Sequence, residues 1–219
     1  AVVGLKNKAL SKPLEDLRKS GVKIVSLVSD LPEQHRDHYI GIDNTKAGKS
    51  AARLVGMAHT GRAGRVIVMV GSLQARDHLD RFHGFKEVII NDYPNLEIDD
   101  VLETKDDPKV LREQLQERLA ANDAVTALYN VGAGNQGLID ALRMTDRSDT
   151  TFSVVHELTG DTRQALEDRV VDVAIDQRPE IELNRALALL RAIVDNLPPP
   201  PVTELIPAIY LRDNLPDET

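Results

Sequence analysis

The chain has 219 residues, 42% hydrophobic and 28% charged, which is enough apolar material to bury the core of one large domain or of two lobes. Its formal net charge of −8 disfavours binding of this chain to nucleic-acid backbones, and no apolar run reaches the roughly 18 residues that a membrane-spanning helix needs. The absence of cysteine excludes disulfides, thiolate catalysis and thiolate metal ligands.

Short apolar runs alternate with segments of helical periodicity along the chain. Strands are expected over residues 22–28, 39–42, 66–70, 96–102, 125–129, 152–155, 170–175 and 205–211. Helices are expected between them: one whose Leu10, Leu14 and Leu17 face inward, one after Thr104, and others over residues 44–59, 78–91, 134–144, 161–168 and 180–196. This alternation, with strands buried on both faces, predicts an α/β protein with parallel sheets flanked by helices.

Local residues indicate where several elements begin. Asp43 is suited to cap the helix after residues 39–42, and Thr104 to cap the helix that has Pro108 in its first turn. One stripe of that helix is apolar, with Val110, Leu111, Leu115 and Leu119. Residues 198–201 are four prolines, which favour an extended linker.

The number of strand-helix units differs between the two ends of the chain. Residues 43–177 hold five expected strands with covering helices, enough for a complete lobe. Before Asp43 there are about three strands and one helix, which is too little to close a second core. Either the first lobe is small, or an opening βαβα segment is missing; we favour the second interpretation. The first residues resemble no secretory signal and include no initiator Met, so we expect a fragment.

The most specific short motif is Gly132-Ala133-Gly134-Asn135-Gln136-Gly137, a G-x-G-x-x-G between an expected strand and helix. That context fits a dinucleotide-binding turn, and Glu157 follows at the spacing of a ribose-binding acid. The alternative is a strand-helix turn that uses glycine for its geometry alone.

Polar residues follow most of the expected strands, at the edge where parallel sheets bind ligands. They combine guanidinium, carboxylate, amide and imidazole groups, a mixture that suits the hydroxyls of a polyol. Each has a plainer alternative, such as a helix cap at Asp43, an exposed salt bridge at Arg81 or a core role for Tyr129. The residues are Ser29, Asp30, Asp43, Ser72, Arg76, Arg81, Asn130, His156, Glu157, Asp176 and Gln177.

Catalytic and metal motifs are weak. Residues 70–74 do not complete a G-x-S-x-G elbow, and no H-E-x-x-H is present. His35 and His38 share a loop with Glu33 and Asp37, which a solvated loop explains better than a metal site. We therefore expect no enzymatic activity, no cofactor and no metal.

Taken together in order, several segments resemble the effector-binding domain of LacI-type transcription regulators, which is related to the type I periplasmic sugar-binding proteins. The resemblance spans nearly the whole chain. It is carried by residues 22–27 (V-K-I-V-S-L), 39–44 (Y-I-G-I-D-N) leading to Ala47-Gly48, 76–85 (R-D-H-L-D-R-F-H-G-F), 123–142, 154–159 (V-V-H-E-L-T) and 173–179, which end in Gln177-Arg178-Pro179.

The resemblance implies a two-lobed clamp that closes on a sugar-like effector. Residues 1–42 and 178–204 would form a partial first lobe, and residues 43–177 and 205–219 the second. Arg81 would bind sugar hydroxyls, Glu157 would supply the ligand carboxylate and His156 a wall of the site. The remaining contacts would come from Ser29, Asp30, Asn130 and Gln177.

The sequence departs from the regulator pattern in three ways. Glu157 and His156 stand where the family usually has Asp and Phe, and the loop after Asn130 is about one residue short. The DNA-binding headpiece is absent, so the resemblance implies a partial effector domain from a cytoplasmic homodimer whose operator contacts come from that missing part. Two alternatives stay open: a periplasmic sugar-binding protein of a transporter, and an NAD(P)-dependent oxidoreductase that uses residues 132–137.

Overall fold

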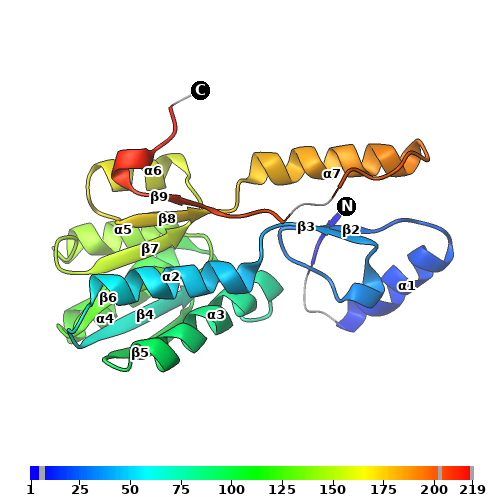
Figure 1. Cartoon of the computed structure of the whole chain (residues 1–219). Helices are drawn as coiled ribbons and strands as arrows, with labels where there is room; N and C mark the ends of the chain where they lie inside the picture. The colour runs from blue at the N-terminus through cyan, green and yellow to red at the C-terminus, as the bar shows by residue number, and fades with distance from the viewer. Residues whose placement is uncertain (5–7, 202–203, 218–219) are drawn as a thin grey trace.

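The computed structural model describes residues 1–4, 8–201 and 204–217, and it contains two sheets. The smaller sheet has three parallel strands in the order β1-β2-β3, and the larger has six in the order β5-β4-β6-β7-β8-β9. Figure 1 shows them in separate lobes joined by narrow crossings of the chain. The predicted α/β class, with parallel sheets flanked by helices, is confirmed.

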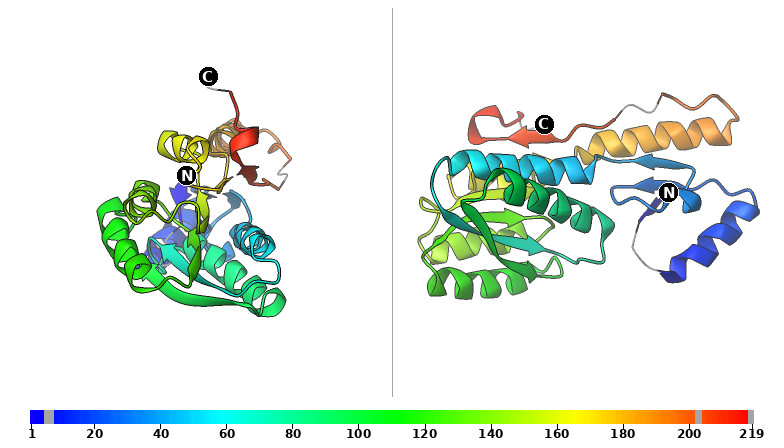
Figure 2. Two further views of the ribbon diagram at one scale, coloured as in Figure 1. Left: turned by 90° about the vertical axis from the view of Figure 1, so that its left-hand side faces the viewer. Right: turned by 60° about the horizontal axis from the view of Figure 1, so that its bottom comes forward.

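The larger sheet is covered by helices on both faces (Figures 1 and 2). Its core strands are buried because of this cover, and residues 66–70 are fully shielded from solvent. Its strands are β4 (Gly64–Val70), β5 (Leu96–Glu103), β6 (Val125–Asn130), β7 (Phe152–His156), β8 (Val173–Asp176) and β9 (Ala208–Tyr210). Its helices are α2 (Asn44–Ala58) and α3 (Arg76–Asp92) on one face, and α4 (Pro108–Ala121), α5 (Asn135–Met144) and α6 (Gly160–Glu167) on the other.

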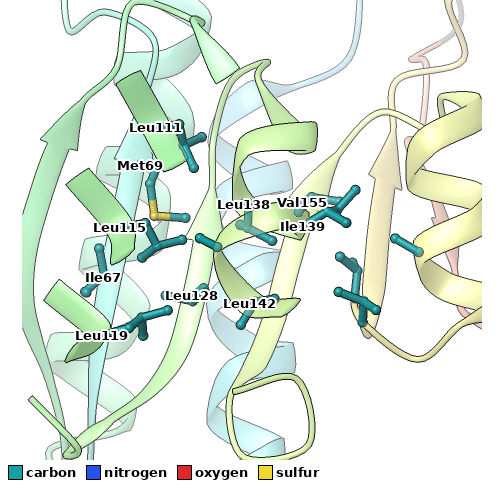
Figure 3. Close-up of a cluster of buried hydrophobic side chains, with 14 of the residues drawn as sticks. Ile67, Met69, Leu111, Leu115, Leu119, Leu128, Leu138, Ile139, Leu142 and Val155 are labelled. Carbon is teal, nitrogen blue, oxygen red and sulfur yellow. The ribbon is translucent and has the colours of Figure 1, made fainter. Parts of the chain in front are cut away.

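The core between the sheet and helices α4 and α5 consists of interlocking aliphatic side chains (Figure 3). Leu111, Leu115 and Leu119 of α4 lie against Ile67 and Met69 of β4. They are the apolar stripe predicted for this helix, whereas Val110 is only partly buried. The opposite face has its own core, where α2 and α3 cover the same strands.

The smaller lobe is thin. Its sheet consists of β1 (Val2–Val3), β2 (Val25–Leu27) and β3 (His38–Ile40), with α1 (Ser11–Lys19) on one face and α7 (Pro179–Val194) on the other. Leu14 of α1 is buried and Leu10 partly so, but Leu17 is 45% exposed, so the prediction that it faces inward is wrong. Leu17 points away because only part of this short helix contacts the sheet.

Two helix starts test the predicted caps. Asp43 caps α2 by accepting a hydrogen bond from the Lys46 amide, as predicted. Thr104 does not cap α4; it is buried, and its hydroxyl donates to the carbonyl of Val70. Asp107 takes the cap position because it directly precedes Pro108, which occupies the first turn of the helix.

The last strand is shorter than predicted and runs in the opposite direction. β9 pairs antiparallel with β8, at the edge of an otherwise parallel sheet. After α7 the chain runs back beside that helix, so it reaches the sheet from the end at which β8 finishes (Figure 1). On the way Leu205 forms one parallel bridge with Ile42, where two crossings between the lobes lie side by side.

Candidate functional site

A cavity of about 440 Å³ opens at the carboxyl-terminal edge of the larger sheet. The loops that follow parallel strands gather at this edge, and the neighbouring strands β6, β7 and β8 all end here. Four of the residues predicted from the sequence line the cavity: Arg81, His156, Glu157 and Gln177. The remaining lining residues are Asp77, His78, Asp106, Pro108, residues 132–136, Thr159 and Asp161.

Arg81 is the central buried cation of this cavity, with an exposed fraction of 3%. Its Nε donates to Asn44 Oδ1 at 2.7 Å, one terminal nitrogen to the carbonyl of Val131 at 3.0 Å, and the other to Gln177 Oε1 at 3.2 Å. The guanidinium therefore ties together the start of α2, the end of β6 and the loop after β8. A buried charge needs such partners, so Arg81 is more than the exposed salt-bridge residue considered from the sequence.

Helices α2 and α3 can place Arg81 there because glycines let them pack closely. A Cβ on Gly48 would lie 1.9 Å from the Arg81 carbonyl oxygen, and one on Gly84 would lie 2.2 Å from that of Thr45. Both distances are well below van der Waals contact, so larger residues would push the helices apart.

His156 forms part of the floor of the cavity, at the end of β7, and is 1% exposed. Its Nε2 lies 2.9 Å from the hydroxyl of Tyr129, whose ring stacks on Phe85. Burial holds the pKa of His156 well below its ordinary value, so the ring is neutral. If the buried tyrosine hydroxyl donates to Nε2, then Nδ1 carries the proton; it makes no hydrogen bond of good geometry, although the ring also interacts with the backbone of Ile175.

Glu157 directly follows His156, in the left-handed backbone region with φ 70°. Its Oε1 is buried and has no hydrogen-bond partner. Burial and the charge of Asp176 together raise the pKa of Glu157 to about 7, against the opposing effects of Arg81 and of a hydrogen bond from the backbone of Gln177. Asp176 itself accepts hydrogen bonds from the amides of Leu158 and Arg178.

Glu182, in the first turn of α7, is a second buried carboxyl near this edge that the sequence did not single out. It is 2% exposed, and neither oxygen makes a hydrogen bond of good geometry. Burial, together with the charge of Glu157, raises the pKa of Glu182 to about 7. The two carboxyls are therefore close enough to influence each other across the crossing between lobes.

The other three predicted site residues lie outside the cavity lining. Asn130 is fully buried at the end of β6, where its amide nitrogen donates to the Ala133 carbonyl and to Asn135, and its Oδ1 has no partner. Ser29 contacts the other lobe, because its hydroxyl accepts a hydrogen bond from the Asp77 amide at 3.3 Å. Asp30 is paired with Arg36 and Ser26.

A model of the family described as the periplasmic binding protein domain matches residues 1–198. The chain belongs to this family. The glucose-galactose binding protein GanP of Geobacillus stearothermophilus superposes with a TM-score of 0.89 at 21% identity, over 98% of this chain and 76% of that one. The predicted two-lobed type I fold is thereby confirmed.

Two further solved structures share the fold. An ABC transporter solute-binding protein of Burkholderia graminis, in complex with D-arabinose, has a TM-score of 0.88 and 23% identity over 94% of this chain and 73% of that one. The fructose-binding periplasmic domain of a hybrid two-component system has a TM-score of 0.84 and 19% identity over 94% and 68%. No curated protein matches the sequence.

In this periplasmic-binding-protein domain the glycines of the G-x-G-x-x-G motif are explained by packing. A Cβ on Gly137 would lie 2.0 Å from the Pro108 carbonyl oxygen, and one on Gly132 would lie 2.5 Å from Asp106 Oδ1. Gly134 has φ 84°, which glycine adopts most readily. The three glycines thus allow the loop over residues 106–108 to pack closely against the turn. This favours the alternative in which the motif is a strand-helix turn that uses glycine for its geometry alone.

A second cavity, of about 520 Å³, lies at the crossings on the side of Asp30 and α7. Among its lining residues are Tyr39, Asn44, Arg76, Arg185 and Pro201. Among the described residues, no group of three or more His, Asp or Glu side chains is arranged to hold a metal ion. No helix in that part of the chain is long and apolar enough to cross a membrane.

Two asparagines that the sequence did not single out as site residues hold parts of the site in place. Asn44 follows the capping Asp43 and was expected only to start a helix, yet its Oδ1 accepts a hydrogen bond from Arg81 Nε. Asn135 donates to the His156 carbonyl at 2.8 Å, which holds the end of β7. A polar residue in the first turn of a helix that follows a strand is the signal that marks both positions.

Proposed function

We propose that this domain binds a small polyhydroxy ligand, a sugar or sugar derivative, in the cavity at the edge of the larger sheet. The observation that carries the proposal is that two residues of the cavity lining hold buried polar atoms without a hydrogen bond of good geometry, His156 Nδ1 and Glu157 Oε1. Asn130 Oδ1, at the end of β6 and outside the lining, is a third such atom. Native proteins leave few such atoms unsatisfied, so a donor-acceptor ligand is the natural partner. A sugar hydroxyl both donates and accepts.

Ligand binding would work by closing the two lobes. Arg81, His156, Glu157 and Gln177 present their polar atoms from the second lobe, and the Ser29–Asp77 contact shows where the first lobe meets it. A ligand that contacts both lobes favours the closed arrangement, since only that arrangement satisfies both sets of groups. The proposed role is binding without chemistry: the His156 ring is neutral and its Nε2 is held by the hydroxyl of Tyr129.

For the wider role, we favour a binding protein that serves a transporter or a sensor. GanP is named a glucose-galactose binding protein, the Burkholderia protein an ABC transporter component and the third relative a sensor domain, and all share this fold. The LacI-type effector domain inferred from the sequence, with its operator DNA, dimer and cytoplasmic location, is the second candidate. It is supported by the ordered motif set alone.

The ligand proposal is tested by thermal melting of the chain against sugars, polyols, sugar acids and sugar phosphates, with NAD(H) and NADP(H) included. A ligand at 100 times its dissociation constant adds about 2.7 kcal/mol, or roughly 5–10 °C for a domain of this size. A shift with a sugar-like compound, confirmed by calorimetry, supports the proposal. A shift with a dinucleotide alone would establish the oxidoreductase alternative instead.

The choice between a transport or sensor role and a regulator role is tested by sequencing the gene upstream of the codon for residue 1. Codons for a secretory signal upstream of residue 1 would support the transport or sensor role. Codons for a basic helix-turn-helix segment would establish the regulator, and an electrophoretic shift of operator DNA by the complete protein would follow.

A further inference from the structure

The charge of the ligand can be inferred from the charges around the cavity, on the premise that the proposed function is correct. The carboxyl groups of Asp77, Asp106, Glu157 and Asp161 line the cavity, whereas Arg81 is the one arginine or lysine among the described residues that line it. Asp106 is partly occupied, because its Oδ1 accepts the amide of Ala133. When ionised, these carboxyl groups carry negative charge that basic groups of the lining or a bound ligand must balance.

Arg81 does not balance it. Its three hydrogen bonds go to uncharged acceptors on Asn44, Val131 and Gln177, and so hold the guanidinium in the wall. His156 does not balance it either, because its burial keeps the imidazole neutral. His78, the third basic side chain of the described lining, has its Nε2 3.8 Å from Asp77 Oδ2. Among the described residues, none of the three forms an ion pair with Glu157.

Glu157 is the acid that most needs a partner. Its Oε1 is shielded from water without a hydrogen bond, while its neighbours across the packed elements are mainly acidic. Asp176 on β8 and Asp77 on α3 raise its pKa, and the charge of Glu182 on α7 interacts with it; the charge of Arg81 on α3 and a hydrogen bond from the backbone of Gln177 oppose the shift. Such a site stabilises a cation that brings its own hydrogen-bond donors.

We propose that the ligand is a cationic sugar derivative, an amino sugar, whose protonated amine binds Glu157 while its hydroxyls contact the other polar groups of the cavity. An ammonium offers three donors, so it satisfies the Glu157 carboxylate directly. The ring oxygen and hydroxyls of the sugar accept hydrogen bonds from His156 Nδ1 and from the amide nitrogen of Gln177, whose amide oxygen already accepts from Arg81.

Matched ligands separate this inference from the proposed function. D-Glucosamine, D-glucose and N-acetyl-D-glucosamine, together with the corresponding galactose and mannose series, differ only at the amine. Calorimetry at about pH 6.5, where the sugar amine is protonated, gives the affinities. We expect at least one amino sugar to bind about tenfold or more tighter than both of its neutral counterparts, the range of a hydrogen bond to a charged group.

Proton release provides a second readout that needs no variant. Because burial raises the pKa of Glu157 to about 7, a share of its carboxyls is protonated at about pH 6.5 without ligand. Binding of a cation expels that proton, so a fraction of a proton leaves per ligand bound, measured as the dependence of binding heat on the ionisation enthalpy of the buffer. A neutral sugar expels little or none.

The Glu157→Gln variant keeps the shape of the side chain and removes its charge. It should bring the amino sugar to within about threefold of its neutral counterpart and abolish proton release. Glu180→Gln, on the exposed side of the α7 start, is the matched control and should keep the preference. If a neutral sugar binds as tightly as its amino counterpart, the inference is overturned and the proposed function stands; if no member of either series binds, both fall.

Discussion

The Glu182→Gln substitution tests the energetic cost of the buried carboxyl at the start of α7. Glutamine has nearly the same shape, so the change removes the negative charge and little packing. Burial and the charge of Glu157 raise the pKa of Glu182 from 4.5 to about 7 in the folded chain. The folded state therefore favours the protonated acid, and ionisation destabilises it.

The sign follows from proton linkage. Below about pH 4.5 the carboxyl is protonated in both folded and unfolded chains, so it costs nothing. Between about pH 4.5 and pH 7 the unfolded chain loses this proton first, and folding stability falls as pH rises. Above pH 7 the penalty is complete. At about 1.4 kcal/mol per pH unit it reaches about 3 kcal/mol, and the 2% exposure of Glu182 leaves little screening by water.

The assay is a set of melting curves for wild type and Glu182→Gln at pH 5, 6, 7 and 8 (about one unit apart across the window). The variant should gain little at pH 5 and about 2–3 kcal/mol at pH 8, or roughly 4–10 °C in Tm. Glu180→Gln, exposed on the same helical turn, should follow wild type throughout. A variant whose advantage is equal at every pH, or that is less stable at pH 8, would refute the reasoning.

Four other predictions follow from single contacts. Arg81→Ala should abolish ligand binding and also cost about 2–4 kcal/mol in urea unfolding, because Asn44 and the Val131 carbonyl lose their donor; unchanged stability would contradict the buried network. Gly137→Ala should cost about 2–4 kcal/mol through its clash with Pro108, whereas Gly160→Ala, which meets nothing within 4 Å, should change stability by under about 0.5 kcal/mol. Asp107→Ala should destabilise by about 1 kcal/mol through loss of the α4 cap, and an unchanged urea midpoint would argue against that cap. Tyr129→Phe should cost about 1 kcal/mol and weaken ligand binding, because His156 Nε2 loses the hydroxyl that fixes its tautomer; equal affinity in calorimetry would show that the tautomer is not important.

Most of the fold could be predicted from the sequence because its elements carry strong local signals. The unbroken run over residues 66–70 indicates a strand buried on both faces, and that strand lies inside the larger sheet, between β5 and β6. The direction of β9 could not be predicted, because it depends on how far the chain travels beside α7 before it returns. The cap of α4 was assigned to Thr104 because a threonine and an aspartate compete within four positions, and only their distance from Pro108 separates them.

The candidate site was predictable where residues directly follow strands. His156 and Glu157 end β7, and Gln177 follows β8, so their meeting at one edge is a property of parallel sheets. Glu182 was not predictable in this way, because it lies within a helix whose polar residues are mostly exposed. Its burial arises only when the start of α7 packs against the crossings between lobes, a contact between segments far apart in the sequence.

The hydrogen bonds of Arg81 indicate how a ligand in the cavity can influence the crossings between the two lobes. Asn44, Val131 and Gln177 belong to three different segments, and Gln177 lies in the crossing from β8 to α7. Of the three contacts, the one to Gln177 is the longest at 3.2 Å and the one that a ligand oxygen can replace without moving either α2 or β6. Replacing it would free the Gln177 amide beside the crossing that leads to α7. A ligand that engages Arg81 would therefore change the restraints on the lobe angle through a side chain it need not touch, which is the coupling that a clamp requires.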